Sequence, residues 1–341
     1  MKKLNFILSL VAALVVTSYA SARDQIKIVG SSTVYPYATV VAEKFGKGGK
    51  FKTPVIESTG TGGGMKLFCA GVGVNHPDIT NASRAIKSNE KDLCAKNGVK
   101  DILEIIVGND GLTFAQSVKA KDVNFTKEQL WRALAHDVEV NGKLVANPYK
   151  KWSDIDKSLP NHAIKILIAP PTSGTRDAWD SLVMGKGCTK AAKAAFEAAG
   201  QKSKKACAKV REDGAAIEAG ENDTLIVNKI VADPEMFGYF GYSYLIANKD
   251  KIKAAKVDGK APSLASIQDY SYGIARPLFF YVKKSHVGVI PGMKEFLAEF
   301  TSKGSMGPKG YLADIGLVPL DDKTYNKVRT AGTQLTTISL N

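Results

Sequence analysis

The turn 172–176, with the sequence Thr-Ser-Gly-Thr-Arg, contains residues well suited to chemistry. It follows the apolar run 163–169, which the pattern predicts as a buried strand, and it precedes a predicted helix that begins near Asp177. At a strand–turn–helix junction, unpaired backbone N–H groups and the positive end of the helix dipole point to one place. These features are typical of an anion-binding site.

Two further turns repeat this design. Residues 30–33 (Gly-Ser-Ser-Thr) lie between a predicted strand, 25–29, and a predicted helix, 34–45. Residues 58–64 (Ser-Thr-Gly-Thr-Gly-Gly-Gly) follow the predicted strand 52–57. Hydroxyl groups donate hydrogen bonds, and glycines let the backbone approach a ligand closely. The candidate donors of the three turns are Ser31, Ser32, Thr33, Thr59, Thr61, Gly62 to Gly64, Ser173, Gly174 and Thr175.

Two arginines, Arg84 and Arg176, supply positive charge close to these turns in the sequence. A guanidinium group offers paired donors that suit a tetrahedral oxyanion. Each feature alone has a simpler explanation: a glycine-rich run is often only a turn, and Ser-Gly-Thr before a helix is most often an N-cap. An arginine there is also more often in a structural ion pair than on a ligand. Three such turns at equivalent places nevertheless favour an anion site.

The sequence lacks the motifs of nucleotide-binding and hydrolytic proteins. Residues 60–66 do not match a P-loop, and Met65 stands where the dinucleotide-binding motif has its last glycine. Neither H-E-x-x-H nor G-x-S-x-G occurs, the four histidines are dispersed, and Ser173 has no evident base nearby. The four cysteines are not spaced as zinc ligands. We therefore expect a binding protein without a metal or another cofactor, and not an enzyme.

The first 22 residues have the pattern of a secretory signal peptide. Two lysines precede the apolar run 4–16, and Ala20-Ser21-Ala22 predicts cleavage after Ala22. The alternative, an N-terminal anchor helix, agrees less well with so short an apolar run. The rest of the sequence contains no apolar stretch long enough to span a membrane. We therefore expect an exported, soluble protein of a bacterial periplasm.

All four cysteines lie in the expected mature chain. An even number of cysteines in an oxidising compartment favours two disulfides. Of the three possible connectivities we expect the sequential pairs, Cys69–Cys94 and Cys188–Cys207, because they close short local loops.

The chain is strongly basic, with a formal net charge of +14 that becomes +12 without Lys2 and Lys3. Eight basic residues and a single acid, Glu197, lie between Lys186 and Arg211. A positive field of this size can draw small anions toward a cleft, although a solvated basic surface would have the same composition. Nucleic acid is a poor partner, because the chain is expected to be exported and its basic residues are not interleaved with aromatic ones.

The first part of the mature chain predicts an α/β layer with a largely parallel sheet, because it contains three strand–turn–helix units. Two of them contain the turns 30–33 and 58–64, and the third has a strand at 78–81 that leads into the turn 82–84. Ligands of open α/β sheets lie at the carboxyl ends of the strands, where all three polar turns are predicted. Later strands are predicted at 102–107, 112–118, 238–247 and 275–282. The chain is expected to leave the first domain near residue 110 and to return near residue 278, so that this domain is discontinuous.

Seven segments match one known family in their order and spacing. They are GSSTVYP (30–36), GTGGGMK (60–66), NASR (81–84), TSGTR (172–176), GYFGYSY (238–244), VDGKAP (257–262) and RPLFFYV (276–282). On these segments the chain resembles the PstS-like periplasmic phosphate-binding proteins of bacterial ABC transporters, over essentially the whole mature length. The resemblance implies a periplasmic-binding-protein-like fold with two α/β lobes, which are joined by two crossover segments and hold the ligand in the cleft between them.

The resemblance also sets the expected domains, ligand and partners. Lobe I is expected at 23–112 plus 278–341, and lobe II at 113–277. The cleft is expected to close over one inorganic phosphate, which the protein, as a monomer, would deliver to an inner-membrane ABC transporter permease. The resemblance implies that the hydroxyl and amide ligands of the phosphate are Ser32, Thr33, Thr61, Gly62, Ser173, Gly174 and Thr175.

Two positions depart from the family pattern. Well-known members have an aspartate where this chain has Arg84, and an arginine where it has Ala169. That aspartate accepts the proton of hydrogen phosphate, so the acid with this role here is open among Glu57, Asp177 and Asp223. The alternatives are a receptor for another tetrahedral oxyanion, such as sulfate or molybdate, and, less consistent with the sequence, an exported phosphatase or a surface adhesion protein.

Overall fold

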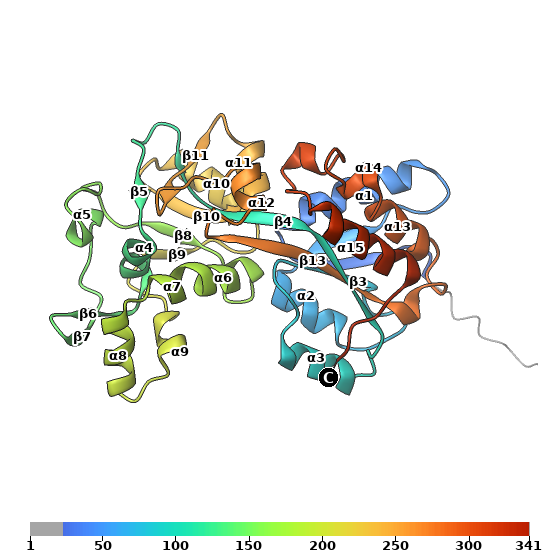
Figure 1. Ribbon diagram of the computed structural model, residues 1–341, viewed down its shortest axis with the longest axis horizontal. Coiled ribbons are helices and arrows are strands. Elements are labelled where there is room, and N and C mark those ends of the chain that lie inside the picture. The colour runs from blue at the N-terminus through green and yellow to red at the C-terminus, as the bar shows by residue number, and fades with distance from the viewer. Residues whose placement is uncertain (1–22, 341) are drawn as a thin grey trace, which may run out of the picture.

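A nine-stranded mixed sheet passes through both halves of the protein in this computed structural model, which describes residues 23–340 (Figure 1). The strands of one half are β1 (Lys27–Gly30), β2 (Val55–Ser58) and β3 (Ile79–Ala82). Those of the other half are β8 (Ile166–Ile168), β9 (Ala216–Glu218), β10 (Phe237–Gly241) and β11 (Ile252–Ala254). Two long strands, β4 (Ile102–Ser117) and β13 (Ala275–Lys283), cross between the halves. We call the half with β1 lobe I and the half with β8 lobe II.

Helices surround the sheet in each lobe (Figure 1). Those of lobe I are α1 (Tyr35–Lys47), α2 (Thr61–Phe68), α3 (Ser88–Lys96), α13 (Met293–Phe300), α14 (Lys303–Met306) and α15 (Asp322–Gln334), with the 3₁₀ turns η2 (Lys284–His286) and η3 (Ala313–Ile315). Those of lobe II are α4 (Lys127–Leu134), α5 (Trp152–Ile155), α6 (Gly174–Trp179), the π-helical turn η1 (Asp180–Met184), α7 (Gly185–Gly187), α8 (Lys190–Ala198), α9 (Ser203–Cys207), α10 (Asp223–Ala232), α11 (Tyr242–Ala247) and α12 (Leu264–Gln268). Two small sheets pair β5 (Asn124–Phe125) with β12 (Lys256–Val257), and β6 (Asp137–Val140) with β7 (Lys143–Ala146).

The sheet order explains where the polar turns lie. It runs β2-β1-β3-β13-β4-β10-β8-β9, with β11 beside β4. In lobe I, β1 is parallel to β2 and β3, and in lobe II, β8 is parallel to β9 and β10. The predicted α/β layer with largely parallel strands is therefore confirmed, and the three turns follow the carboxyl ends of β1, β2 and β8.

The crossing strand β4 differs from the prediction of two strands at 102–107 and 112–118. It is one strand of 16 residues, because the turn-like segment 108–111 (Gly-Asn-Asp-Gly) remains extended. This segment pairs with residues 275–278 of β13, so that Asp110 lies opposite Arg276. Strand pairing therefore overrides the local preference of these residues for a turn.

The predicted strand 238–247 is also wrong in its second half. The strand β10 ends at Gly241, and helix α11 begins at Tyr242. The backbone N–H of Tyr242 donates to Asp110 Oδ1 at 2.8 Å, so a carboxylate from β4 binds the start of this helix. A carboxylate at a helix N-terminus is favourable in the field of the helix dipole.

Each lobe has its own apolar core. In lobe I, α1 and α13 pack their buried residues on the sheet, around Tyr37, Phe280 and Phe296. In lobe II, buried aromatic rings of Phe114, Trp152 and other residues pack on one another. Separate cores make each lobe a rigid support for the turns that it carries.

Both disulfides have the expected pairing, Cys69–Cys94 and Cys188–Cys207. The first joins the C-terminal end of α2 to α3, and the second closes the segment that contains α8 and α9. Within residues 23–340 no helix has the length and apolar character that a membrane span requires. The predicted signal peptide lies outside the described residues.

Candidate functional site

The three polar turns meet at the interface between the lobes, beside the crossing strands. The hydroxyl of Thr33 in lobe I is 2.9 Å from that of Thr175 in lobe II. The N–H of Gly62, in the first turn of α2, donates to the carbonyl of Thr172 across the lobes at 2.9 Å. The Thr61 hydroxyl is 3.2 Å from that of Ser83. The hydroxyl donors from both lobes therefore face one another in one buried place.

Local sequence explains how each turn presents its donors. Ser173 is the N-cap of α6, and its Oγ accepts from the N–H of Thr175 at 3.1 Å. Ser32 and Thr33, before α1, are buried, as are Thr61 and Ser173. The first N–H groups of α2 and α6 have no partners within their own helices. That of Gly62 donates to Thr172 of the opposite lobe, and that of Thr175 donates to its N-cap, Ser173.

Glycine is required where the lobes approach most closely. A Cβ at Gly174 would overlap the hydroxyl oxygens of Ser83 and Thr61 in lobe I. Gly60, which precedes α2, has a φ of +71° and would place a Cβ on the carboxylate of Glu221 in lobe II. These two positions let backbone meet side chain across the interface without a clash.

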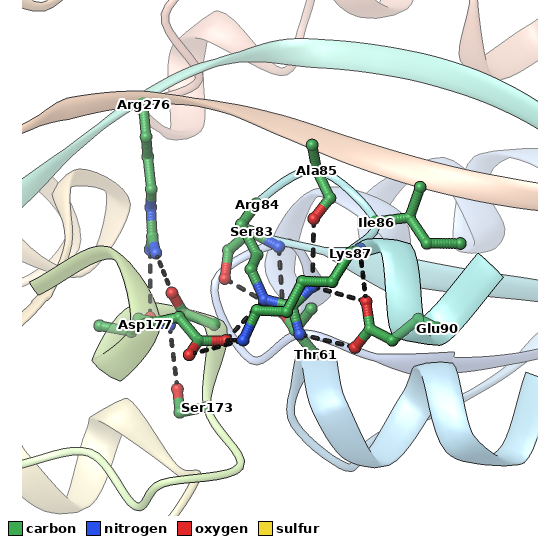
Figure 2. Close-up of polar contacts among 12 residues, drawn as sticks. Thr61, Ser83, Arg84, Ala85, Ile86, Lys87, Glu90, Ser173, Asp177 and Arg276 are labelled. Carbon is green, nitrogen blue, oxygen red and sulfur yellow. Dashed lines mark hydrogen bonds and ion pairs between the residues drawn. The ribbon is translucent and has the colours of Figure 1, made fainter. Parts of the chain in front are cut away.

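A third arginine, Arg276 of β13, lies at the centre of the donors. Its Nη2 donates to the hydroxyls of Thr33 and Thr175, at 3.1 Å each, and its Nη1 donates to the carbonyl of Gly174 at 2.8 Å. Its guanidinium also forms a buried ion pair with Asp110 at 3.2 Å. Figure 2 shows the side chain extending from the crossing strand toward the start of α6.

Arg276 is not among the site residues that the sequence predicted, although it lies in the matching segment 276–282. The signal that could have found it is an arginine within a predicted crossing strand of otherwise apolar character. Burial lowers the pKa of Arg276, and the neighbouring Asp110 opposes this effect. Burial likewise raises the pKa of Asp110, which Arg276 opposes.

The two arginines that the sequence predicted for the site form ion pairs with acids. Arg84 donates from Nε to Asp177 of lobe II at 2.6 Å, and from Nη1 and Nη2 to both oxygens of Glu90. The ammonium of Lys87 also binds Asp177, at 2.9 Å, so that two cations of lobe I share this carboxylate (Figure 2).

Arg176 lies entirely within lobe II. It pairs with Asp180 one helical turn later, at 2.9 Å, and donates to the carbonyl of Ala169 at 3.3 Å. The resemblance led us to expect an arginine at position 169, and Arg176 places a guanidinium close to that position. Burial raises the pKa of Asp180 to about 6, against the opposing effect of Arg176.

The three acids that the sequence left open as proton acceptors have different environments in the structure. Glu57 is half exposed and pairs with Lys27, and Asp177 is held by Arg84 and Lys87. Asp223 is buried, and burial raises its pKa to about 8. Its Oδ2 has no hydrogen-bond partner among the described residues.

A further acid, which the sequence did not predict, also lies at the site. Glu221 accepts a hydrogen bond from the Thr172 hydroxyl at 2.8 Å, and burial raises its pKa. Its Oε2 is buried and has no partner within the described part of the chain. Glu221, in the loop before α10, therefore lies beside the turn that precedes α6, and Asp223 at the start of α10 lies within the electrostatic influence of Glu221 and Arg276.

A groove of about 750 Å³ adjoins the donors between the lobes. Ser83 and Arg276 line it, together with the basic residues Arg84, Lys87, Lys186 and Lys204. The strongly basic segment 186–211 therefore contributes lysines to the groove. Positive charge at this place raises the local concentration of anions.

Comparisons with known proteins agree with this arrangement. A model of the PBP superfamily domain matches residues 15–303. The protein SphX of Synechococcus elongatus is 32% identical over 312 residues, 89% of this chain and 79% of that protein. The phosphate-binding protein PstS of Staphylococcus saprophyticus is 31% identical over 313 residues, 89% of this chain and 82% of that protein. The crystal structure of a possible phosphate binding protein from Planctomyces limnophilus is 27% identical, with a TM-score of 0.58 over 92% of this chain and 99% of that one. The chain therefore belongs to the PBP superfamily and, within it, to the family that contains PstS and SphX.

Proposed function

We propose that this chain is an exported receptor that captures inorganic phosphate between its lobes and delivers it to an ABC transporter permease. The meeting of the three donor turns between the lobes, two of which contact Arg276, is the observation that carries this proposal. A relative of 31% identity is named a phosphate-binding protein, which supports the same ligand. The protein would act by binding and release rather than by catalysis.

The chemistry of the site suits a small tetrahedral oxyanion. The turns offer hydroxyls and backbone N–H groups, which donate to anion oxygens, and the N-termini of α2 and α6 favour negative charge. The ligands that we propose are Ser32, Thr33, Thr61, Gly62, Ser173, Gly174 and Thr175. Arg84 and Arg176 belong to the proposed site as the positive charges that border it.

Several features accompany this proposal. The signal peptide would be cleaved after Ala22, and the receptor would work in the periplasm as a monomer. The lobes would extend over 23–112 with 278–341 and over 113–277, so that the crossing strands act as the hinge. No nucleic acid is proposed as a partner.

Calorimetry on the purified protein tests the ligand. We expect one phosphate to bind tightly per chain, and sulfate and molybdate to bind much more weakly. Tight binding of sulfate or molybdate without binding of phosphate would contradict the assignment and favour the other oxyanion. A chromogenic phosphate ester tests the alternative of a phosphatase, and turnover that is lost in Ser173→Ala would support that alternative instead.

The ion pair between the lobes gives a prediction about release. Asp177→Asn is expected to release phosphate roughly tenfold faster or more, because hydrogen bonds to charged groups contribute about 1.5–3 kcal/mol and this variant loses the charge of the acceptor. Arg84 and Lys87 both hold Asp177 across the interface, with little exposure of Arg84 and Asp177. Stopped-flow measurement of phosphate dissociation gives the rate.

A matched control for this variant is Asp233→Asn. Asp233 pairs with Lys165 at 3.0 Å, and both residues belong to lobe II. Removing an ion pair within one lobe should leave the dissociation rate unchanged. Equal dissociation rates for the two variants would show that the Asp177 pair does not hold the lobes together.

A further inference from the structure

We propose that Arg276 is the charged residue that binds the anion directly, and that its place on a crossing strand couples anion binding to closure of the lobes. This inference rests on the proposed capture of an oxyanion between the lobes. It assigns the central charge of the site to the hinge rather than to either lobe.

The position of Arg276 is set by strand pairing. Arg276 of β13 lies directly opposite Asp110 of β4 in the antiparallel ladder, and both strands cross between the lobes. Asp110 Oδ2 accepts from Nε and Nη2 of Arg276 at 3.2 Å, and Oδ1 accepts from the N–H of Tyr242. The carboxylate is therefore fixed by both strand and helix, and it holds the guanidinium in one orientation.

The remaining donors of Arg276 point to both lobes at once. Nη2 contacts the Thr33 hydroxyl of lobe I and the Thr175 hydroxyl of lobe II, which also contact each other. A hydroxyl rotates freely and can donate to an anion instead of accepting from arginine. A tetrahedral oxyanion placed among these groups accepts from both hydroxyls and from Nη2. Charge-assisted hydrogen bonds of this kind are roughly twice as strong as neutral ones.

Arg84 and Arg176 are less suited to this role. Arg84 uses Nε, Nη1 and Nη2 on the carboxylates of Asp177 and Glu90, which an entering anion would have to displace. Arg176 directs Nε to Asp180 and Nη1 to the carbonyl of Ala169, and both partners belong to its own lobe. Arg276 differs because its Nη2 donates to the neutral hydroxyls of Thr33 and Thr175, one in each lobe, and these are weaker acceptors than an anion.

Burial makes this arginine effective. Its side chain is 5% exposed and that of Asp110 is fully buried, so water screens their interactions with an anion weakly. When the lobes part, Thr33 and Thr175 separate, but Arg276 and Asp110 remain paired through the crossing strands. The guanidinium is then already in place at the floor of the cleft, and closure brings both hydroxyls back to the anion.

The test must separate binding by Arg276 from its structural pairing with Asp110. Removing one member of a buried ion pair destabilises the fold, because the other charge is left without a partner. The neutral double variant Arg276→Gln/Asp110→Asn removes both charges and keeps groups that can hydrogen-bond across the strands. The control is Arg211→Gln/Asp213→Asn, because Arg211 is a buried arginine of lobe II that pairs with Asp213 and with backbone carbonyls.

Thermal unfolding without ligand and calorimetry with phosphate are the two measurements. We expect each single variant at Arg276 and Asp110 to unfold at a lower temperature, and the double variant to recover part of this loss. Phosphate affinity of the double variant should fall on the order of 100-fold or more, the scale for truncating a buried charged hydrogen-bonding partner. The control pair should bind phosphate as the wild type does. A folded double variant with wild-type affinity would overturn the proposal.

Two further measurements complete the test: the affinity of Arg276→Lys, and the binding of other anions by the wild type. Arg276→Lys keeps the positive charge but loses the planar, paired donors of the guanidinium. Its phosphate affinity should therefore lie between those of the wild type and the double variant. An unchanged affinity would contradict direct binding of the anion by Arg276. If the double variant fails to fold, this comparison decides. If the wild type binds sulfate or molybdate instead of phosphate, the proposed ligand is wrong, and the same series read with that anion still tests Arg276. Binding of none of the three anions by the wild type would overturn both proposals.

Discussion

Replacing Gly174 with alanine is expected to abolish phosphate binding while leaving both lobes folded. The new Cβ would overlap the hydroxyl oxygens of Thr61 and Ser83, which belong to the opposite lobe. The lobes would therefore be held apart, and no anion could contact the donors of both. Gly174 begins α6 with ordinary helical geometry, and alanine has the higher helix propensity, so lobe II should lose no stability.

Calorimetry with phosphate and thermal unfolding together check this prediction. Gly304→Ala is the matched control, because Gly304 also lies in a helix and its nearest neighbour to a Cβ is 3.7 Å away. This control should bind phosphate normally. Normal affinity in Gly174→Ala would show that the lobes do not need to approach as closely as they do here in order to hold the anion.

Asp223→Asn is expected to stabilise the protein increasingly as the pH rises from 5 to 8. Burial raises the pKa of Asp223 to about 8 from its ordinary value of 3.8. Arg276 lowers this pKa, whereas Asp110 and Glu221 raise it. The folded state therefore keeps a proton at pH 7 that the unfolded state releases.

The direction of the pH effect follows from proton linkage. Below pH 4 both states hold the proton, and Asp223 makes no unfavourable contribution. Between pH 4 and 8 the unfolded state loses its proton while the folded state retains it, so stability falls by about 1.4 kcal/mol per pH unit. Above pH 8 the loss is complete. Asparagine does not titrate, so the variant lacks this fall.

Urea unfolding of wild type and variant at pH 5, 6, 7 and 8 measures the difference. The advantage of Asp223→Asn should grow steadily over this range, by about 4 kcal/mol in all. Asp269→Asn is the control, because Asp269 is exposed and its pKa is lowered, so that it stays ionised above pH 5. A constant difference between wild type and Asp223→Asn would mean that Asp223 is already ionised in the folded protein.

The parts of the site that depend on neighbouring residues could be predicted from the sequence. Ser173 caps α6 as the turn 172–176 predicted, whereas the predicted turn 58–64 is shorter than expected, because residues 61–64 already belong to α2. Both disulfides close short loops, so the sequential pairing needed no knowledge of the fold. Hydrogen bonding within a turn and the onset of a helix are local properties, and local sequence encodes them.

The crossing strands show where local patterns fail. Residues 108–111 have the composition of a turn, and residues 242–247 continue an apolar run that resembles a strand. In the structure, pairing with β13 keeps the first segment extended, and Asp110 binds the start of the helix that replaces the second. Tertiary contacts decide the conformation wherever the local preferences are weak.

The same distinction holds for the charges of the site. The sequence by itself determined that three turns could offer hydroxyls and N–H groups to an anion, because strand, turn and helix follow one another along the chain. Only the tertiary structure decided which arginine contacts the hydroxyls of these turns. Arg84 finds Asp177 93 residues away, and Arg276 finds Asp110 166 residues away. Such partners depend on how the lobes face each other and on the register of two crossing strands, and no local pattern contains either.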